Sequence, residues 1–265
     1  MTPEPLSARN PRVARLGRLV RRHDERDAAA LLVVEGPVLV AAALDAGLAV
    51  TEIYVDAGSL ERPGVVALLA DARLGGVESW SLPAGALDRI GDVATSQGVV
   101  ALVRRSPAAW PDPAVAPFVV VLAEVADPGN VGTLIRTAGA SGAGAVVAVG
   151  GADPHGPKAI RASAGAAFAL PVVAAPPPVG AAVGRLRTAG YRVVATVARG
   201  GVAHHAADLT GPVALLLGNE AHGLDPEVAA AADLAVTIPL APAVESLNVA
   251  AAAAVVCFEV ARPRP

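Results

Sequence analysis

The 265-residue chain is poor in cysteine and aromatic residues and has no long apolar run. Its one cysteine, Cys257, excludes a disulfide framework and suits a reducing compartment. Although 54% of the residues are hydrophobic, the longest apolar runs, residues 249–258 and 117–123, are shorter than the roughly 20 residues of a membrane-spanning helix. The opening "MTPEPLSARN" has no apolar segment that would direct secretion. We therefore predict a cytoplasmic protein with an Ala/Val-rich core and no membrane partner.

Lysine is almost absent as well, since the basic residues are 20 Arg and one Lys, Lys158. The net charge of −3 argues mildly against a polyanionic partner, but the charge is unevenly distributed. Residues 9–26 contain seven Arg and two acidic residues, a net charge of +5, and their apolar residues recur at helical spacing. Two interpretations of this basic helix stay open: an ordinary solvated face, or an arm on which Arg15, Arg18 and Arg22 contact nucleic-acid phosphates.

A proline-rich stretch, "RRSPAAWPDPAVAP", divides the chain. It predicts an N-terminal domain at residues 1–104, a linker at 105–116 and a second domain at 117–265. On both sides short apolar strands alternate with helices, which is typical of α/β domains. After the linker the strands are continuous apolar runs, which predicts a mostly parallel sheet covered by helices on both faces. Strands are expected at residues 30–34, 50–55, 98–103, 118–125, 145–150, 171–175, 192–198, 212–218 and 234–240.

Ligands of such sheets bind beyond the carboxyl ends of the strands, and the segments there are unusually polar. "AEVADPGNVGTLIRTAGA" leads from one strand into a helix that carries Asn130 and Arg136. A surface position, or an ion pair with Glu124 or Asp127, is the alternative interpretation of Arg136. "LLLGNEAHGLDPE" leads from another strand through Gly218, a residue that would let a ligand approach the backbone closely.

A third polar segment, "PAVESLNVAAAAAVVCFEV", opens the last and most apolar helix. Helix capping explains part of it, because Ser246 is a good N-cap and Glu245 would lie near the positive end of the helix dipole. Capping by Ser246 leaves Asn248, a poor helix former, inside the first turn. The alternative is that these side chains belong to a site.

Several common nucleotide, metal and hydrolase motifs are absent from the sequence. Gly139, Gly142 and Gly144 are spaced as in a dinucleotide-binding loop, but they follow a predicted helix and precede a strand, which is the wrong order. His204 and His205 are adjacent and lack the spacing of metal ligands, so no metal is expected. No P-loop and no serine-hydrolase motif is present.

The three polar segments together resemble the SpoU/TrmH branch of the SPOUT class of RNA methyltransferases. The matching strings are "DPGNVGTLIRTA", "LLLGNEAHGL" and "IPLAPAVESLNVAAAAAV", in the order and spacing of that family. Upstream, "NPRVARL", "LVVEGPVLVAAAL" and "TSQGVVALV" are similar to the small substrate-binding domain that often precedes the catalytic one. The resemblance therefore covers the whole chain.

This resemblance implies a fold, a cofactor and a reaction. The fold would be a small N-terminal α/β substrate-binding domain and a C-terminal, mostly parallel α/β sheet with a deep trefoil knot. The protein would be a homodimer whose active site is completed across the interface. S-adenosylmethionine would donate a methyl group to a ribose 2′-hydroxyl in RNA, with rRNA favoured over tRNA.

The resemblance also implies roles for residues. Arg136 stands where the family's proposed base lies, but an arginine is effectively always protonated, so we expect its guanidinium to hold a phosphate or a developing alkoxide. Asn130, Ser246 and Asn248 would position the ribose, and Glu220 is one candidate proton acceptor.

The cofactor and RNA contacts follow from the same strings. Main-chain groups of the cofactor loops would read the edge of the adenine. The cofactor residues are predicted to be Leu217, Gly218, Asn219, Ile238, Leu240 and Leu247. "PKAIRASAGA" resembles a further family stretch, which would place Lys158 and Arg161 near RNA, although a plain surface helix is equally compatible.

Two other classes of function stay open. One is a non-catalytic RNA-binding or ribosome-assembly protein that retains the fold, although such a protein would not need all three cofactor segments. The other is a nucleotide enzyme such as a dehydrogenase, against which the order of the glycine-rich loop argues.

Overall fold

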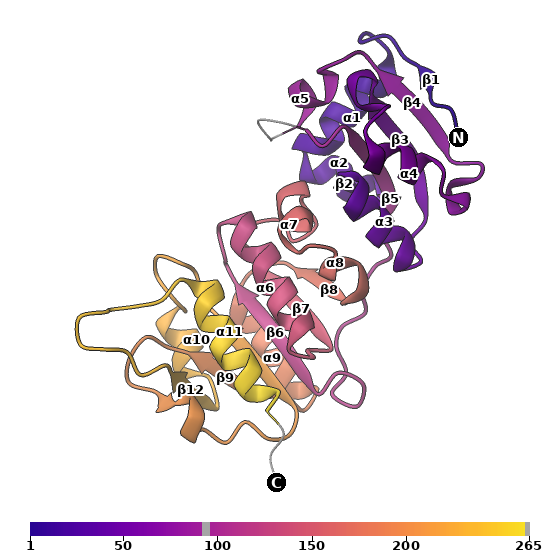
Figure 1. Cartoon of the computed structure of the whole chain (residues 1–265). Helices are drawn as coiled ribbons and strands as arrows, with labels where there is room; N and C mark the ends of the chain where they lie inside the picture. Colours follow the sequence, from indigo (N-terminus) through magenta and orange to yellow (C-terminus); the bar gives the residue numbers. More distant parts are fainter. Residues whose placement is uncertain (92–95, 263–265) are drawn as a thin grey trace. The chain divides into compact units, whose positions relative to one another are not determined.

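The computed structural model describes residues 1–91 and 96–262, which form two compact units (Figure 1). Unit 1 contains Met1–Ser106 and His155–Phe168, and unit 2 contains Pro107–Pro154 and Ala169–Pro265. Residues 155–168 thus fold with unit 1. The domain boundaries predicted from the sequence place them in the second domain. The first residue of the string "TSQGVVALV", at position 95, lies outside the described residues.

Unit 1 is built on a mixed five-stranded sheet with the order β1-β4-β3-β5-β2. Strands β2 and β3 pair antiparallel with β5, whereas β1 and β3 pair parallel with β4. The strands are β1 (Glu4–Pro5), β2 (Leu31–Glu35), β3 (Val50–Asp56), β4 (Glu78–Leu82) and β5 (Val99–Arg104). The α-helices are α1 (Pro11–Arg21), α2 (His23–Ala29), α3 (Pro37–Asp45), α4 (Pro63–Leu69), α5 (Ala86–Ile90), α7 (Pro157–Ala162) and α8 (Ala166–Ala169). The sequence predicted neither β1, β4 nor α5.

Both faces of the unit 1 sheet are covered, because apolar side chains alternate along its strands. On β2, Leu32 packs into a core with residues of α3 and α4, and Leu31 packs into a second core with residues of α1 and α5. Ile160 and Phe168 join the first of these cores, which explains why residues 155–168 belong to unit 1.

The predicted basic helix at residues 9–26 is two helices, so the expectation of one continuous helix is wrong. The first helix, α1, begins at the Asn10 cap followed by Pro11, a favourable pair for a helix start. Arg22 adopts an extended conformation with φ −113° and ψ 118°, and this residue separates α1 from α2.

Unit 2 contains a seven-stranded sheet with the order β10-β12-β9-β11-β6-β7-β8. Every pair of neighbouring strands in this sheet is parallel, which confirms the predicted mostly parallel α/β fold. The strands are β6 (Phe118–Ala123), β7 (Ala145–Val149), β8 (Val172–Ala175), β9 (Arg192–Thr196), β10 (Val202–Ala203), β11 (Val213–Leu217) and β12 (Leu234–Thr237).

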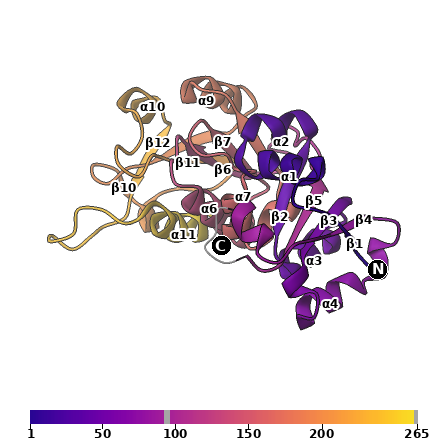
Figure 2. The same cartoon turned by 90° about the horizontal axis from the view of Figure 1, so that it is seen from above.

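Helices lie on both faces of this sheet: α9 and α10 on one face, α6 and α11 on the other (Figure 2). Their bounds are α6 (Pro128–Ala140), α9 (Val179–Thr188), α10 (Pro226–Ala230) and α11 (Val249–Val260). Helices α6 and α10 begin with an aspartate cap followed by proline, at Asp127 and Asp225. These local signals fix where each helix starts at the carboxyl edge of the sheet.

Gly142 and Gly144 lie between α6 and β7, after a helix and before a strand as predicted, whereas Gly139 lies in the last turn of α6. Gly142 follows the C-cap of α6 at φ 80°, a conformation that favours glycine. Within the described ranges, no helix is long and apolar enough to span a membrane.

Candidate active site

The carboxyl ends of four neighbouring parallel strands meet at one edge of the unit 2 sheet, in the order β12-β9-β11-β6. Three of these strands lead into the polar segments predicted from the sequence (Figure 1). The loop after β6 enters α6, the loop after β11 leads to α10, and the loop after β12 leads to α11. The topology therefore brings together segments that are far apart in the chain.

Glu220 joins the loop after β11 to the start of α6. One carboxylate oxygen accepts hydrogen bonds from the Asp127 amide at 3.0 Å and from Asn130 Nδ2 at 2.9 Å. The other oxygen accepts from the Ala126 amide at 2.9 Å. Partial burial by itself would raise the pKa of Glu220, but the hydrogen bonds from Asn130, Ala126 and Asp127 outweigh it and hold the pKa below its usual range. Glu220 is therefore an ionised clamp on the segment that carries Asn130.

Asn248 extends this cluster from the third segment. Its side-chain amide donates to Asn130 Oδ1 over a long distance of 3.4 Å. Its side-chain oxygen accepts from the amides of Ala250 at 2.9 Å and Ala251 at 3.3 Å, so Asn248 is the N-cap of α11. The interpretation of Ser246 as the cap, with Asn248 inside the first turn, is wrong. The cap lies two residues later, at Asn248, whose backbone angles of φ −53° and ψ 140° are non-helical as expected for an N-cap residue.

Arg136 lies on the exposed side of α6, whose buried side includes Leu134 and Ile135. Its guanidinium makes no hydrogen bond or ion pair with any residue that the structure describes, so the alternative of a pair with Glu124 or Asp127 has no support. Six residues of helix separate it from Asn130, a rise of about 9 Å. The chain thus gathers Asn130, Glu220 and Asn248 but leaves Arg136 outside this cluster.

The loop after β11 is held by its own backbone. Asn219 and Gly223 exchange two backbone hydrogen bonds of 2.9 Å, and the side-chain amide of Asn219 donates to the carbonyl of Glu124 at 2.9 Å. A Cβ on Gly218 would lie 2.3 Å from the carbonyl carbon of Gly223. Glycine is therefore required at position 218 because the backbone of Gly223 passes close to it. This contact accounts for the glycine without a bound ligand. Leu217, the last residue of β11, is buried.

A cavity of about 400 Å³ lies between the loops after β9 and β12, at the same carboxyl edge of the sheet. This volume is within the range of about 300–1,000 Å³ usual for small-molecule sites. Ile238 and Leu240, two of the predicted cofactor residues, line it together with Arg199, which the sequence did not single out. The sequence offered no reason to select Arg199, because a single arginine in a glycine-rich loop forms no recognisable motif. Only its position at the cavity reveals it.

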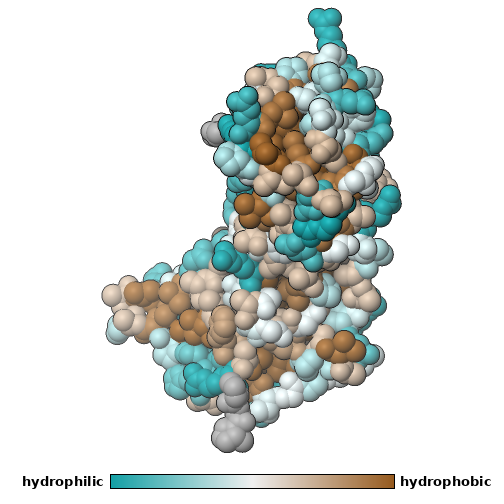
Figure 3. All heavy atoms as spheres, turned by 45° about the vertical axis from the view of Figure 1, so that its right-hand side comes forward, coloured by the Kyte–Doolittle hydropathy of each residue, from teal (hydrophilic) through white to brown (hydrophobic). Residues whose placement is uncertain are grey.

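Ser246 and Leu247 lie outside both the cluster and the cavity. They belong to the exposed stretch between β12 and α11, on which hydrophobic side chains gather where it projects from unit 2 (Figure 3). Leu247 is 40% exposed, and Val244 in the same stretch is 45% exposed. The cofactor roles of Leu217, Gly218, Asn219, Ile238, Leu240 and Leu247 stay predictions. The ribose roles of Asn130, Ser246 and Asn248 stay predictions as well.

The predicted RNA contacts of the basic helices are already paired with carboxylates of unit 1. Arg15 Nη1 lies 2.6 Å from Glu52 Oε1, and Arg18 Nε lies 3.3 Å from Glu25 Oε1. The Arg22 side chain binds Asp24, with Nη2 2.5 Å from Oδ2. An RNA phosphate would have to displace these carboxylates, which adds a free-energy cost to RNA binding at these arginines. The RNA contact stays a prediction.

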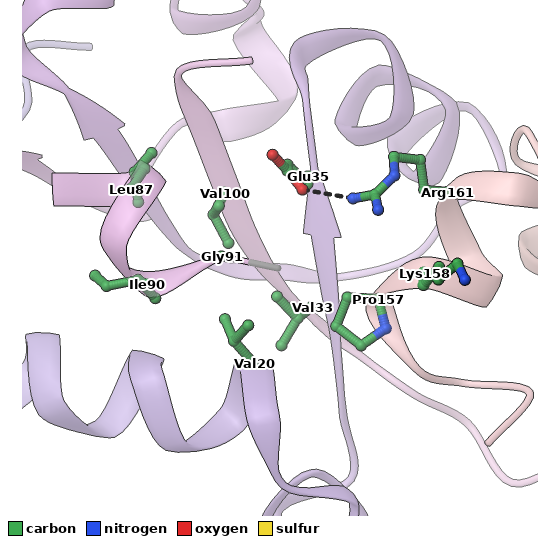
Figure 4. Close-up of a pocket in the computed structure, with 10 residues that line it drawn as sticks. All are labelled: Val20, Val33, Glu35, Leu87, Ile90, Gly91, Val100, Pro157, Lys158 and Arg161. Carbon is green, nitrogen blue, oxygen red and sulfur yellow. Dashed lines mark hydrogen bonds and ion pairs between the residues drawn. The ribbon is translucent and has the colours of Figure 1, made fainter. Parts of the chain in front are cut away.

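Lys158 and Arg161 lie on α7 in unit 1, beside a small cavity (Figure 4). Arg161 Nη1 pairs with Glu35 Oε2 at 2.8 Å, and the cavity walls are mainly apolar, with Val33 and Val100 among them. Its volume of about 20 Å³ holds no more than about one water molecule. This cavity is too small for a nucleobase, and RNA contact by α7 stays a prediction.

Two regions of the chain match models of known protein families. The model of the SpoU rRNA methylase family matches residues 117–258, and a model of the substrate-binding domain of RNA 2′-O ribose methyltransferases matches residues 33–109. The protein is therefore a methyltransferase of the α/β class with an added substrate-binding domain. The chain belongs to the SpoU rRNA methylase family, which confirms the resemblance found in the sequence.

Individual methyltransferases are similar to this chain over most of its length. A 23S rRNA (guanosine-2′-O)-methyltransferase of Bacillus subtilis is 34% identical over 69% of this chain and 72% of its own length. The AdoMet-bound rRNA methyltransferase of Sinorhizobium meliloti is 31% identical, with a TM-score of 0.80 and 97% of both chains covered. The SpoU methyltransferase AviRb of Streptomyces viridochromogenes in complex with AdoMet is 30% identical, with a TM-score of 0.82, 96% of this chain covered and 97% of that chain.

Proposed function

We propose that this chain transfers the methyl group of S-adenosylmethionine to the 2′-hydroxyl of a ribose in ribosomal RNA. The observation that carries the proposal is the hydrogen-bonded cluster of Asn130, Glu220 and Asn248, which comes from three family segments. It lies at the carboxyl edge of the unit 2 sheet, the edge at which the loops after β9 and β12 form a cavity of about 400 Å³. The names of the rRNA-modifying relatives support ribosomal RNA over transfer RNA.

The donor supplies an activated methyl group on a sulfonium, so the protein has to position the hydroxyl and manage its proton. Asn130 and Asn248 have amide groups at the edge of the cluster that are suited to bind ribose hydroxyls. Glu220 acts as a positioning residue, because its two oxygens already accept three hydrogen bonds and its lowered pKa makes it a weak base. The proton leaves through the neighbouring phosphate or water.

Arg136 has the remaining role, which is electrostatic. A guanidinium grips a phosphate with two parallel hydrogen bonds and stabilises negative charge on an attacking oxygen. Because Arg136 is exposed and lies outside its own chain's cluster, we assign it to the active site of a second copy. This places the site at the interface of a homodimer.

The exposed face of α11 supports the homodimer. Ala251, Val255 and Phe258 follow one another at helical spacing and are exposed, with Phe258 exposed by 53%. Helix α11 packs beside α6, the helix that carries Arg136 (Figure 1). A symmetric partner would cover the apolar face and receive Arg136 in one interface. The trefoil knot and the cytoplasmic location belong to the same proposal.

The test uses labelled S-adenosylmethionine with the purified protein and two RNA pools, rRNA and tRNA from a strain that lacks the protein. We expect label in a ribose of rRNA. Label in tRNA alone would show that tRNA is the substrate instead of rRNA. Donor binding with no transfer to either RNA would favour a non-catalytic RNA-binding protein.

A further inference from the structure

The cavity between the loops after β9 and β12 carries two opposite charges that the transfer chemistry does not use. Arg199 and Glu245 are its charged lining residues, and the other lining residues are apolar apart from Thr237.

Neither charge is neutralised by the protein. Arg199 and Glu245 are both exposed, and neither has a hydrogen bond or an ion pair among the residues that the structure describes. Two other arginines of unit 2, Arg187 and Arg192, are paired with aspartates. Arg187 Nη2 lies 2.6 Å from Asp233 Oδ1, and Arg192 Nη1 lies 3.6 Å from Asp208 Oδ2. Arg199 is thus available to a ligand.

The loop that carries Arg199 is fixed against the loop that carries Ile238. Thr237 Oγ1 donates a hydrogen bond of 3.0 Å to the carbonyl of Ala198. A Cβ on Gly201 would lie 2.8 Å from the carbonyl oxygen of Ala235, so glycine allows the two segments to approach closely. The position of Arg199 at the cavity is therefore set by the backbone on both sides of it.

The charges select the kind of ligand. An RNA phosphate would be attracted by Arg199 but repelled by Glu245 in the same cavity, whereas a zwitterion would satisfy both. We propose that the cavity binds the α-amino-acid end of the methyl donor, with Arg199 holding its carboxylate and Glu245 its ammonium group. Arginine suits the first role because its planar fork matches a carboxylate. This inference rests on the proposed function, since it takes S-adenosylmethionine as the donor.

The test is calorimetric binding of two ligands that differ only beyond the sulfur. S-adenosylhomocysteine has the amino-acid end, and 5′-methylthioadenosine lacks it. In Arg199→Ala the affinity for S-adenosylhomocysteine should fall about 10-fold or more, the scale of one hydrogen bond between charged groups. The affinity for 5′-methylthioadenosine should not change. Arg199→Lys should recover part of the loss, and Glu245→Gln should weaken S-adenosylhomocysteine selectively. Arg9→Ala, an exposed arginine of unit 1, is the control and should bind both ligands normally.

The outcomes separate the two claims. If the wild-type protein binds neither adenosyl ligand, the proposed function fails and this inference fails with it. If the wild type binds S-adenosylhomocysteine and Arg199→Ala binds it equally well, or loses both ligands to the same extent, this inference alone is overturned.

Discussion

Glu220 and Asn130, 90 positions apart in the chain, are joined by a hydrogen bond of 2.9 Å from the asparagine amide to the carboxylate. The same carboxylate binds the two backbone amides that precede α6. One ionised side chain from the loop after β11 therefore fixes both the entry to α6 and the orientation of the Asn130 amide. Asn248 then reaches the same amide group from the start of α11.

Replacing Glu220 should reveal this clamp through the pH dependence of stability. Because the pKa of Glu220 is lowered in the folded protein, its ionisation stabilises the fold above the unfolded value of about 4.3. That stabilisation is lost as the pH falls through the lower folded-state pKa. We expect Glu220→Gln to melt below the wild type at pH 7 and the difference to shrink below about pH 4.

Glu61→Gln is the matched control for this experiment. Glu61 is exposed and has no hydrogen bond or ion pair among the described residues, so its replacement should leave the melting temperature nearly unchanged. A Glu220→Gln difference that stays constant from pH 7 to pH 3 would contradict an ionised clamp.

Asn248 should show separable roles in stability and turnover. Asn248→Ala removes the N-cap of α11 and should cost about 1 kcal/mol of unfolding free energy. Asn248→Ser can keep the cap but is too short to retain the amide that faces Asn130. We expect Ser to recover the stability and not the turnover, measured by thermal melting beside single-turnover methylation. Full activity of the Ser variant would reduce Asn248 to a cap.

Arg136 should not be replaceable by lysine. An ammonium lacks the planar fork, so Arg136→Lys should lose on the order of 10² to 10³ in turnover while the donor still binds normally. A deprotonated base at this position would predict the reverse, since lysine has the lower intrinsic pKa and would retain activity with a different pH optimum.

Mixing two inactive variants is the control for the location of Arg136. If the site is shared, a mixed dimer of Arg136→Ala and Asn248→Ser chains has one intact site. Random exchange of chains should then restore about a quarter of wild-type turnover. No recovery, with exchange verified by mass, would place Arg136 in its own chain's site.

The basic helices of unit 1 should contribute less to RNA binding than their charge suggests. Three free guanidiniums on phosphates would give a log–log salt slope of about 3, close to 1 for each contact. Because Arg15, Arg18 and Arg22 are paired with carboxylates, we expect the triple Gln variant to change the slope by less than about 1. A change near 3 in filter binding would show that RNA opens all three ion pairs.

The sequence predicted local features well and long-range features poorly. The alternation of strands and helices and the three polar segments depend on short patterns, and the structure places Asn130, Glu220 and Asn248 together as expected. The ion pair from Arg15 to Glu52 spans 37 positions, and no local pattern announces it. The packing of residues 155–168 on unit 1 was not predicted for the same reason. Hydrophobic periodicity shows that an element has an apolar face, but not which other element covers that face.

The cap of α11 was mispredicted for a different reason. Ser246 and Asn248 are both good N-cap types two residues apart, and propensity alone does not choose between them. Arg199 was missed because its significance depends on a cavity formed by two loops that are distant in sequence.

The most direct test of the central claim is to map methylated riboses in rRNA from a strain that lacks this protein and from its parent. A 2′-O-methyl group blocks cleavage of the adjacent phosphodiester by alkali, so a modified position appears as a gap in the cleavage pattern. We predict that one gap in the parent's rRNA disappears in the deletion strain and returns with the wild-type gene but not with Arg136→Lys. Identical patterns in parent and deletion strains, in rRNA, would contradict the assignment of this chain as an rRNA ribose 2′-O-methyltransferase.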